Sequence, residues 1–331
     1  MDCALAMIRR NHSVSRTCRL LRVARSRVNV LLKRSDDWKD RRLACNRQTH
    51  LQQDDSLQKE IQEALFRHPS FGYKRLTAVI NRKRQRTNQP RVNAKRVYRV
   101  AKQKHLLLVS KPSLPGYSKE HNGQVSVDAS NKRWCSDGLE FKCFNGEHVS
   151  MTFVLDCCDR EVISFVAKKG RGLPAWMAQE QVLLAVNRRF GSVNQVPAPL
   201  QLLTDNGSAY TSQKTRHLLK VLGIEDCKTA VGSPQSNGMA ESFVKTLKRD
   251  YLPFIDLESA ETALSSLPGV IKLYNEEHPH SALSYLSPME YRNARGLIET
   301  EPRQEEPICL IPGFMVNRKV EVLEERGVNV W

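Results

Sequence analysis

Three acidic residues, Asp137, Asp205 and Glu241, lie where a folded chain could bring their carboxylates together. Asp205 follows a short apolar run, 199–203, and precedes an Asn-Gly turn signal, so we expect it at the carboxyl end of a buried strand. Asp137 lies near the start of another strand-like run, and 35 residues separate Asp205 from Glu241. Close carboxylates repel by about 4 kcal/mol per pair at an effective dielectric near 20, so such a cluster requires bound cations or retained protons.

Carboxylate oxygens favour Mg²⁺, with Mn²⁺ as the alternative, over zinc. Two such ions about 4 Å apart would activate an attacking hydroxyl and stabilise the leaving oxygen of an in-line phosphoryl transfer. The attacking group would then be water or another hydroxyl, and no Lys, Ser or Tyr nucleophile is needed. The three acids are therefore predicted to be both the catalytic residues and the ligands of two metal ions.

The residues around Glu241 have helical spacing, and their apolar members would face a core. These are Ala240, Phe243, Val244, Leu247 and Tyr251. Lys245 and Lys248 follow Glu241 at i+4 and i+7 on a neighbouring face. Lys248 would lie roughly 10 Å from Glu241 along the axis, which suits a DNA phosphate better than the carboxylate. The plainer alternative is a surface helix with a Glu–Lys pair.

The elements expected around these acids describe an α/β core from residue 131 to 256. Strand-like runs at 134–144, 148–157 and 161–166 are joined by short turns and predict an antiparallel meander. A helix over 174–190, a strand over 200–204, a helix over 211–222 and a strand over 224–228 follow. The segment 257–297 is expected to close the core. It begins with a further helix over 257–274, in which Pro268 is a candidate break. We assign no role to the acidic tail, 298–331.

The acids and their surroundings closely resemble the Asp-Asp-Glu triad of the integrase and transposase superfamily. The segment 233–242 reads SPQSNGMAES, and Lys248 also fits the pattern. The patterns P-x-x-GYKR from Pro69 and VN-x-KRVYR from Val92 resemble the second-frame (OrfB) transposases of a bacterial insertion-sequence family. The segment 274–291 resembles that family's closing motif, although the family usually has Arg near His278.

This resemblance implies an RNase H-like core with mixed sheet and flanking helices, preceded by all-α DNA-binding units. The first acid would lie on the first strand, the second at the end of the fourth, and the third on a helix crossing the sheet. It also implies 3′-strand cleavage at insertion-sequence ends, joining to target DNA, and a homo-oligomer that holds the ends together. The active enzyme of the family can be a frameshifted fusion with an upstream segment.

The front of the chain carries the positive charge. Residues 1–120 have a net charge of +20 and residues 121–331 of −3, within a total of +17. Such a distribution indicates that the front binds a polyanion, double-stranded DNA rather than a membrane, because its basic helices lack Trp/Phe-rich faces. We expect two helical units in this part of the chain. The first, 1–34, resembles a helix-turn-helix with two short helices, and the second, 57–108, has three helices. A linker over 35–56 separates the two units, and a second linker over 109–130 precedes the core. The expected DNA-binding residues there are Arg25, Arg27, Lys74, Arg75, Lys95, Arg96 and Arg99, in addition to Lys245 and Lys248 of the core.

Other polar residues are expected to have structural roles. Asp156 and Asp159 flank a hairpin turn, and Asp128 precedes the first strand, where acids commonly hydrogen-bond the backbone. His278 and His280 fit a structural or DNA-backbone role better than metal binding, because Pro279 disrupts a regular ligand face. The nine cysteines lack a Cys-x-x-Cys motif, which predicts reduced thiols and no zinc site. The sequence shows no apolar signal segment and no apolar run of membrane-spanning length, so we expect a cytoplasmic bacterial protein.

The sequence therefore predicts a metal-dependent DNA transposase. Two alternatives remain: an RNase H-like nuclease that hydrolyses DNA without joining it, and a non-catalytic DNA-binding regulator on a transposase scaffold. The intact triad argues against the regulator, because such a scaffold has no reason to keep three unpaired acids.

Overall fold

The computed structural model describes residues 2–33, 47–108, 127–191, 194–229 and 237–297, with the backbone alone over 47–53. The chain divides into two compact units, 1–56 and 57–331, each described by itself. The segment 233–236 of the glutamate loop and the tail 298–331 lie outside the described residues. Among the described residues, no helix is long and apolar enough to cross a membrane, and seven cysteines are free thiols.

Residues 2–33 of the first unit contain three helices where the sequence predicted two. They are α1 (Asp2–Arg9), α2 (Val14–Leu20) and α3 (Arg25–Leu32). Each helix contributes a buried apolar side chain, namely Ala4, Cys18 and Val28. The additional helix α1 gives the predicted pair a third surface to pack against, which such short helices need to be stable.

Helix α4 (Arg47–Arg67) crosses the boundary between the units, and its part from residue 57 on forms a helical subdomain of the second unit with α5 (Tyr73–Arg86) and α6 (Ala94–Gln103). Apolar residues from all three helices share one core, including Leu57, Leu76 and Val97. The start of α4 corrects the predicted linker, because 47–56 is helical. The end of α5 corrects another expectation, since the basic run 82–86 continues the helix.

Two side-chain contacts explain these helix ends. Arg84 on α5 makes a two-pronged ion pair with Glu60 on α4, with both N–O distances at 2.8 Å, and so anchors the basic run. Arginine, lysine and glutamine are also good helix formers. The predicted cap of α6 is confirmed, because the Asn93 side chain accepts a hydrogen bond from the backbone N–H of Lys95.

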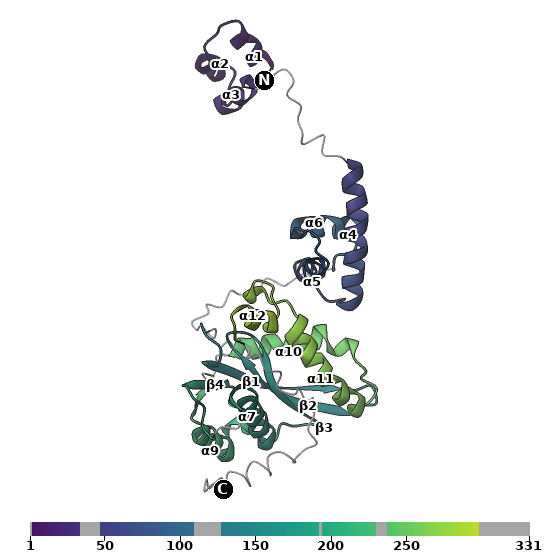
Figure 1. Ribbon diagram of the computed structural model, residues 1–331, viewed down its shortest axis with the longest axis vertical. Helices are drawn as coiled ribbons and strands as arrows, with labels where there is room; N and C mark the ends of the chain where they lie inside the picture. Colours follow the sequence, from purple (N-terminus) through teal and green to yellow (C-terminus); the bar gives the residue numbers. More distant parts are fainter. Residues whose placement is uncertain (1, 34–46, 109–126, 192–193, 230–236, 298–331) are drawn as a thin grey trace. The chain divides into compact units, whose positions relative to one another are not determined.

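The part of the second unit from residue 131 onward contains one five-stranded sheet in the order β3-β2-β1-β4-β5 (Figure 1). The first three strands, β1 (Arg133–Lys142), β2 (His148–Asp156) and β3 (Val162–Lys169), form the predicted antiparallel meander. The strands β4 (Leu200–Thr204) and β5 (Ile224–Lys228) have the predicted bounds and extend the sheet in parallel from β1. This mixed order confirms the expected RNase H-like sheet.

Helices cover both faces of the sheet. The side chains of sequence neighbours on a strand point to opposite faces of the sheet. Trp134 therefore packs on one face with α7 (Ala175–Phe190) and α9 (Gln213–Leu222). Cys135 packs on the other face with α10 (Gly238–Asp250) and α11 (Ala260–Glu277). The predicted helix over 211–222 is α9, which begins two residues later because Ser212 caps it, and a separate short helix, α8 (Ser208–Thr211), precedes it. Pro268 does not break α11, whose flanking residues Leu267 and Val270 are buried.

The chain between α10 and the end of the described residues closes the core. A short 3-10 turn, η2 (Leu252–Phe254), leads to α11, and η3 (Ser281–Leu283) leads to α12 (Pro288–Ala294).

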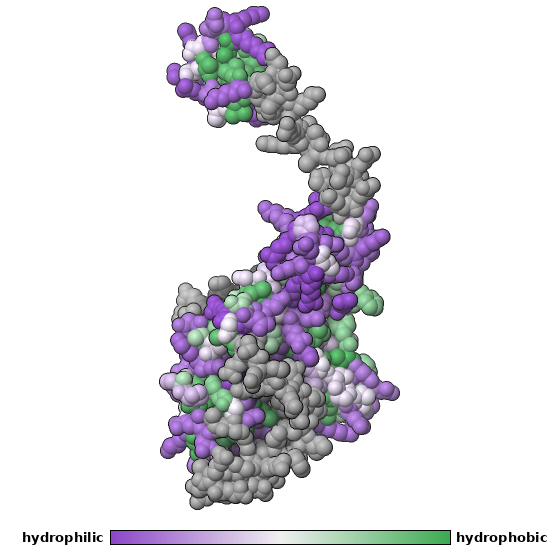
Figure 2. Space-filling view, in the orientation of Figure 1, coloured by the Kyte–Doolittle hydropathy of each residue, from purple (hydrophilic) through white to green (hydrophobic). Residues whose placement is uncertain are grey.

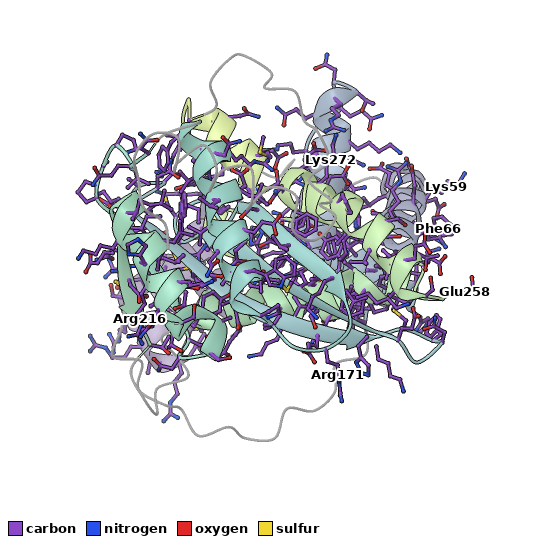
Figure 3. All side chains as sticks on the ribbon, turned by 90° about the horizontal axis from the view of Figure 1, so that it is seen from below. Lys59, Phe66, Arg171, Arg216, Glu258 and Lys272 are labelled. Atoms are coloured by element: carbon purple, nitrogen blue, oxygen red, sulfur yellow. The ribbon has the colours of Figure 1, made fainter. Side chains whose placement is uncertain are left out.

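Hydrophilic residues dominate the visible surface of α4–α6 (Figure 2). The exposed Phe66 on α4 is an apolar exception and lies at the outside of the structure (Figure 3).

Candidate active site

Strands β1 and β4 bring Asp137 and Asp205 to the same edge of the sheet. Their parallel ladder pairs Trp134 with Leu202 and Cys135 with Leu203. The same register, carried two residues further on both strands, sets Asp137 beside Asp205. Asp205 comes directly after β4, as predicted for an acid at a strand's carboxyl end.

The position of Asp205 is shaped by the turn that follows it. Its Oδ1 accepts a hydrogen bond from the backbone N–H of Gly207 over 3.0 Å. A Cβ added at Gly207 would lie 2.9 Å from that same oxygen. The glycine therefore leaves the carboxylate the room it occupies.

The helix that carries Glu241 is held against β1 by a hydrogen bond at its start. It lies in the first turn of α10, where the helix dipole favours a carboxylate. The N-cap residue, Asn237, is buried, and its Nδ2 donates a hydrogen bond to the carbonyl oxygen of Ser136 over 3.1 Å. Because Ser136 directly precedes Asp137, this bond connects the start of the Glu241 helix to the strand that carries the first acid.

The three acids influence one another electrostatically. The pKa of the Asp137 carboxyl is raised to about 6, first because the group is largely buried and then because Asp205 and Glu241 are negatively charged. The Gly138 N–H, which donates to Asp137 Oδ1 over 2.7 Å, and the charge of Lys248 both act in the opposite direction. The region therefore has a negative electrostatic potential, and a bound cation would make it less negative.

No group of three or more His, Cys, Asp or Glu side chains within the described ranges is close enough to hold one metal ion. Each acid instead has a local partner: Asp137 and Asp205 accept backbone N–H groups, and Glu241 lies 3.4 Å from the ammonium of Lys245. Glu241 and Lys245 are both on the helix surface, so their pair is weak and easily exchanged.

A buried polar network that the sequence did not reveal supports this edge of the sheet. The Ser136 hydroxyl lies 2.7 Å from the Tyr210 hydroxyl and 2.7 Å from Gln181 Nε2. Gln181 Nε2 also lies 3.3 Å from the Tyr210 hydroxyl, and burial raises the pKa of that phenol. Ser136 thus contacts α7, α8 and, through its carbonyl, α10.

Lys228 adds a further support beside Asp205. Its ammonium donates to Thr204 Oγ1 over 2.8 Å and to the Tyr210 carbonyl oxygen over 3.1 Å. Thr204 is the last residue of β4, immediately before Asp205. The sequence around Lys228 does not predict its contact with Thr204, because that contact depends on the pairing of β5 with β4.

The predicted DNA-binding residues have different surroundings. Lys245 and Lys248 are exposed on α10, and Arg25 and Arg27 are exposed on α3. On α5 and α6, Lys74, Lys95 and Arg99 are exposed and Arg96 is partly buried. Arg75 differs from the others because its guanidinium pairs with the buried Asp250 at 2.9 Å and lies over the Phe71 ring.

Asp156 and Asp159 are more deeply buried than turn acids usually are. Asp156 Oδ1 accepts the Cys158 N–H over 2.7 Å, as expected for a turn. Asp159 also pairs with Arg292 of α12 at 2.7 Å and with Arg189 of α7 at 3.3 Å. Burial alone would raise the pKa of Asp159, but these guanidinium groups hold it below its ordinary value. These charges fasten α12 to the β2–β3 turn.

His278, which is buried, and His280, which is half-buried, belong to one aromatic cluster. His278 Nδ1 lies 2.9 Å from the Tyr251 hydroxyl, and its ring stacks on Tyr274. Burial lowers the pKa of both imidazoles, that of His280 to about 3, so both are neutral. Their contacts with each other and with Tyr251 and Tyr274 are those of residues in a structural role.

Integrase core domain profiles match residues 127–234 and 222–288. The transposase InsD of insertion element IS2 from Escherichia coli is 46% identical over 296 residues, which cover 89% of this chain and 96% of that protein.

Two solved structures align at lower similarity. The intasome of simian T-cell lymphotropic virus, in complex with a PP2A regulatory subunit, has a TM-score of 0.42 and 17% identity over 65% of this chain and 69% of that chain. The catalytic domain of Mos1 transposase has a TM-score of 0.36 and 18% identity over 50% of this chain and 78% of that chain.

Proposed function

The chain belongs to the insertion-element transposases that carry an integrase core domain, and on that premise we propose that it cuts the 3′ strands at its element's ends and joins them to target DNA. The supporting observation is the parallel pairing of β1, which carries Asp137, with β4, which leads to Asp205, together with the hydrogen bond from Asn237 that joins the start of the Glu241 helix to β1. Burial, followed by the charges of Asp205 and Glu241, raises the pKa of Asp137. Three acids on two adjacent strands and one docked helix form a site suited to phosphoryl transfer.

The donor set fits divalent metal ions. Asp137, Asp205 and Glu241 offer oxygen atoms alone, which suits Mg²⁺ or Mn²⁺, and their mutual repulsion would be relieved by a cation. When bound, two such ions would supply Lewis-acid polarisation of the scissile phosphate and a more acidic attacking hydroxyl. For this purpose Asp137 must lose its proton, and with a pKa of about 6 it is mostly ionised at neutral pH.

The other residues of the site position DNA and the acids. Lys248 is exposed on the helix of Glu241, and its charge acts on Asp137, so a phosphate beside the acids would also lie within its field. Asn237 and Ser136 hold the start of α10 against β1. We assign catalysis to residues 131–256 and closure of the core to 257–297.

DNA binding outside the site is assigned to the helical units 1–34 and 57–108. Arg25 and Arg27 lie on α3, the expected recognition helix, and Lys74, Lys95, Arg96 and Arg99 lie on α5 and α6. Arg75 is left out of this assignment because it is engaged with Asp250 inside the protein. Since two element ends must be held together for joining, we propose that the chain acts as a homo-oligomer.

A strand-transfer assay tests the proposed function. The full chain is incubated with Mg²⁺ and end-labelled element-end DNA, and nicked and joined products are separated on a denaturing gel. A transposase yields 3′-strand nicks followed by joined products. Nicks without joining would identify a nuclease, and binding without either product would identify a regulator; each result would overturn the proposal.

A further inference from the structure

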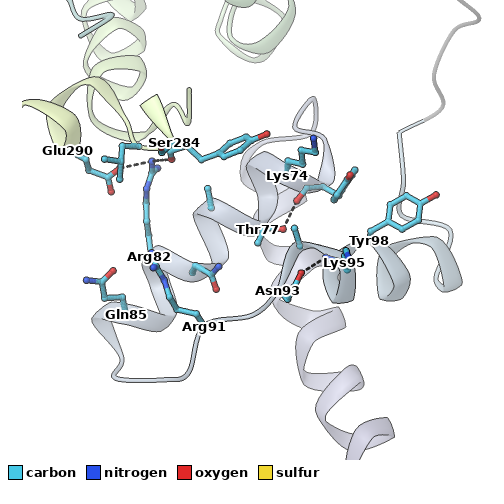
Figure 4. Close-up of a pocket in the computed structure, with 16 residues that line it drawn as sticks. Lys74, Thr77, Arg82, Gln85, Arg91, Asn93, Lys95, Tyr98, Ser284 and Glu290 are labelled. Atoms are coloured by element: carbon cyan, nitrogen blue, oxygen red, sulfur yellow. Dashed lines mark hydrogen bonds and ion pairs between the residues drawn. The ribbon is translucent and has the colours of Figure 1, made fainter. Parts of the chain in front are cut away.

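We propose that a pocket of about 650 Å³ between α5, the start of α6 and residues 284–290 binds an unpaired nucleotide of the DNA (Figure 4). The proposal rests on the proposed function in that it takes DNA as the ligand. It goes beyond that function by assigning a separate subsite, lined by none of the three acids, and a form of DNA, the unpaired strand.

The pocket is a built feature with walls from two parts of the sequence. The side chain of Arg82 on α5 is 17% exposed and lies 2.6 Å from a carboxylate oxygen of Glu290. It also donates to the carbonyl oxygens of Glu277, over 2.6 Å, and Tyr285, over 3.1 Å. Arg82 thus fixes the segment 284–290 against α5 and gives the pocket a defined shape (Figure 4).

The lining favours an anion. Lys74, Arg91 and Lys95 line the pocket and are exposed, and within the described part of the chain no acidic partner is paired with them. Glu290 is the one acid of the lining, and Arg82 neutralises it. Three positive charges therefore remain to bind phosphate, and a nucleic acid is the polyanion on which this family acts.

The lining also offers aromatic surfaces for a base. The rings of Tyr73 and Tyr98 meet edge to face with centroids 5.0 Å apart, and Tyr98 is 41% exposed. Tyr285, from the segment 284–290, also lines the pocket. Bases of unpaired strands stack on such rings regardless of sequence.

The size of the pocket distinguishes an unpaired nucleotide from a duplex. A volume of this order is typical of sites that enclose a small molecule. A double helix is too wide to enter and would leave the tyrosines without a partner, because its bases are stacked inside. A single nucleotide can place its base on Tyr98 and its phosphate near Lys95.

Binding of two DNA probes without divalent metal tests the proposal independently of cleavage. One probe is a blunt fluorescein-labelled element-end duplex, and the other carries an unpaired extension of about three nucleotides. The full-length chain should bind the extended probe more tightly. Tyr98→Ala should remove that advantage, lowering affinity for the extended probe about tenfold or more, with little change for the blunt probe. Tyr98→Phe, which keeps the ring, should behave as the parent.

Matched controls separate the pocket from general effects. Phe66→Ala removes an exposed aromatic outside the pocket, and Lys102→Ala removes a lysine of α6 that does not line it. Neither should reduce the preference for the extended probe, whereas Lys95→Ala should. Equal binding of both probes by the parent, or equal effects of Tyr98→Ala on both probes, would overturn the proposal. Failure of the proposed function would appear separately, as absence of joined products with Mg²⁺.

Discussion

The side-chain amide of Asn237 donates a hydrogen bond to the backbone carbonyl of Ser136 over 3.1 Å, and 101 positions in the sequence separate the two residues. Asn237 is the residue at the N-cap position of the Glu241 helix, and Ser136 precedes Asp137 on β1. One contact therefore sets the position of the third acid relative to the first. Asn237 acts through these neighbours as a positioning residue.

Asn237→Ala is expected to slow strand joining about tenfold, which corresponds to a loss of about 1.4 kcal/mol in positioning. The Mg²⁺ concentration for half-maximal joining should rise, while affinity for element-end DNA stays unchanged. Asn145→Ala, which removes an asparagine that bonds the backbone of the distant β1–β2 turn, is the control. Parental joining and Mg²⁺ dependence in Asn237→Ala would show that the contact does not position Glu241.

Lys248→Ala is expected to weaken engagement of the cleaved DNA end without abolishing chemistry. Losing one phosphate contact should reduce the salt slope of binding by about one, and lower salt or more DNA should partly restore joining. Neither should restore joining by Glu241→Gln. Lys220→Ala, an exposed lysine of α9, serves as the control. The phosphate role is wrong if Lys248→Ala joins DNA like the parent at every salt and DNA concentration.

Much of this site follows from local sequence patterns, and the rest depends on contacts distant in sequence. The helical spacing around Glu241 and the apolar run before Asp205 predicted α10 and β4 because periodicity and strand-end turns are local signals. The network of Ser136, Gln181 and Tyr210 could not be predicted, because its members meet only when β1, α7 and α8 pack together.

Predictions from charge were limited for the same reason. A basic residue reads as a DNA contact in the sequence, yet Arg75 pairs with Asp250, and Arg82 pairs with Glu290. Their partners lie far along the chain, so the pattern around each arginine gives no sign of the pairing. The acids Asp156 and Asp159 were expected to bond the backbone of a turn, and the guanidinium groups that also surround Asp159 come from α7 and α12.

The buried histidines predict that the fold loses stability as the pH falls below about 6.5. Burial, followed by the charges of Arg160, Arg75 and Arg82, lowers the pKa of His280 to about 3 in the folded chain. The unfolded chain therefore takes up a proton that the folded chain does not, which favours unfolding at low pH. Between pH 7.5 and 5.5 this residue should cost about 1.4 kcal/mol of unfolding free energy.

Urea unfolding of the parent and His280→Gln at the two pH values measures this cost. The variant should lose about 1.4 kcal/mol less than the parent over that interval, because its side chain does not titrate. The difference between the two proteins cancels the contribution of the other titrating groups. The same loss in both proteins would contradict the buried, neutral state of His280.

The most direct test of the triad is strand joining in Mg²⁺ by Asp137→Asn, Asp205→Asn and Glu241→Gln, beside Asp128→Asn. Asp128 is the matched control, an exposed acid that precedes the same strand as Asp137 and pairs with Lys132. Each triad variant should lose cleavage and joining while still binding element-end DNA, and Asp128→Asn should join DNA like the parent. Near-parental joining by any one of the three triad variants would contradict the assignment.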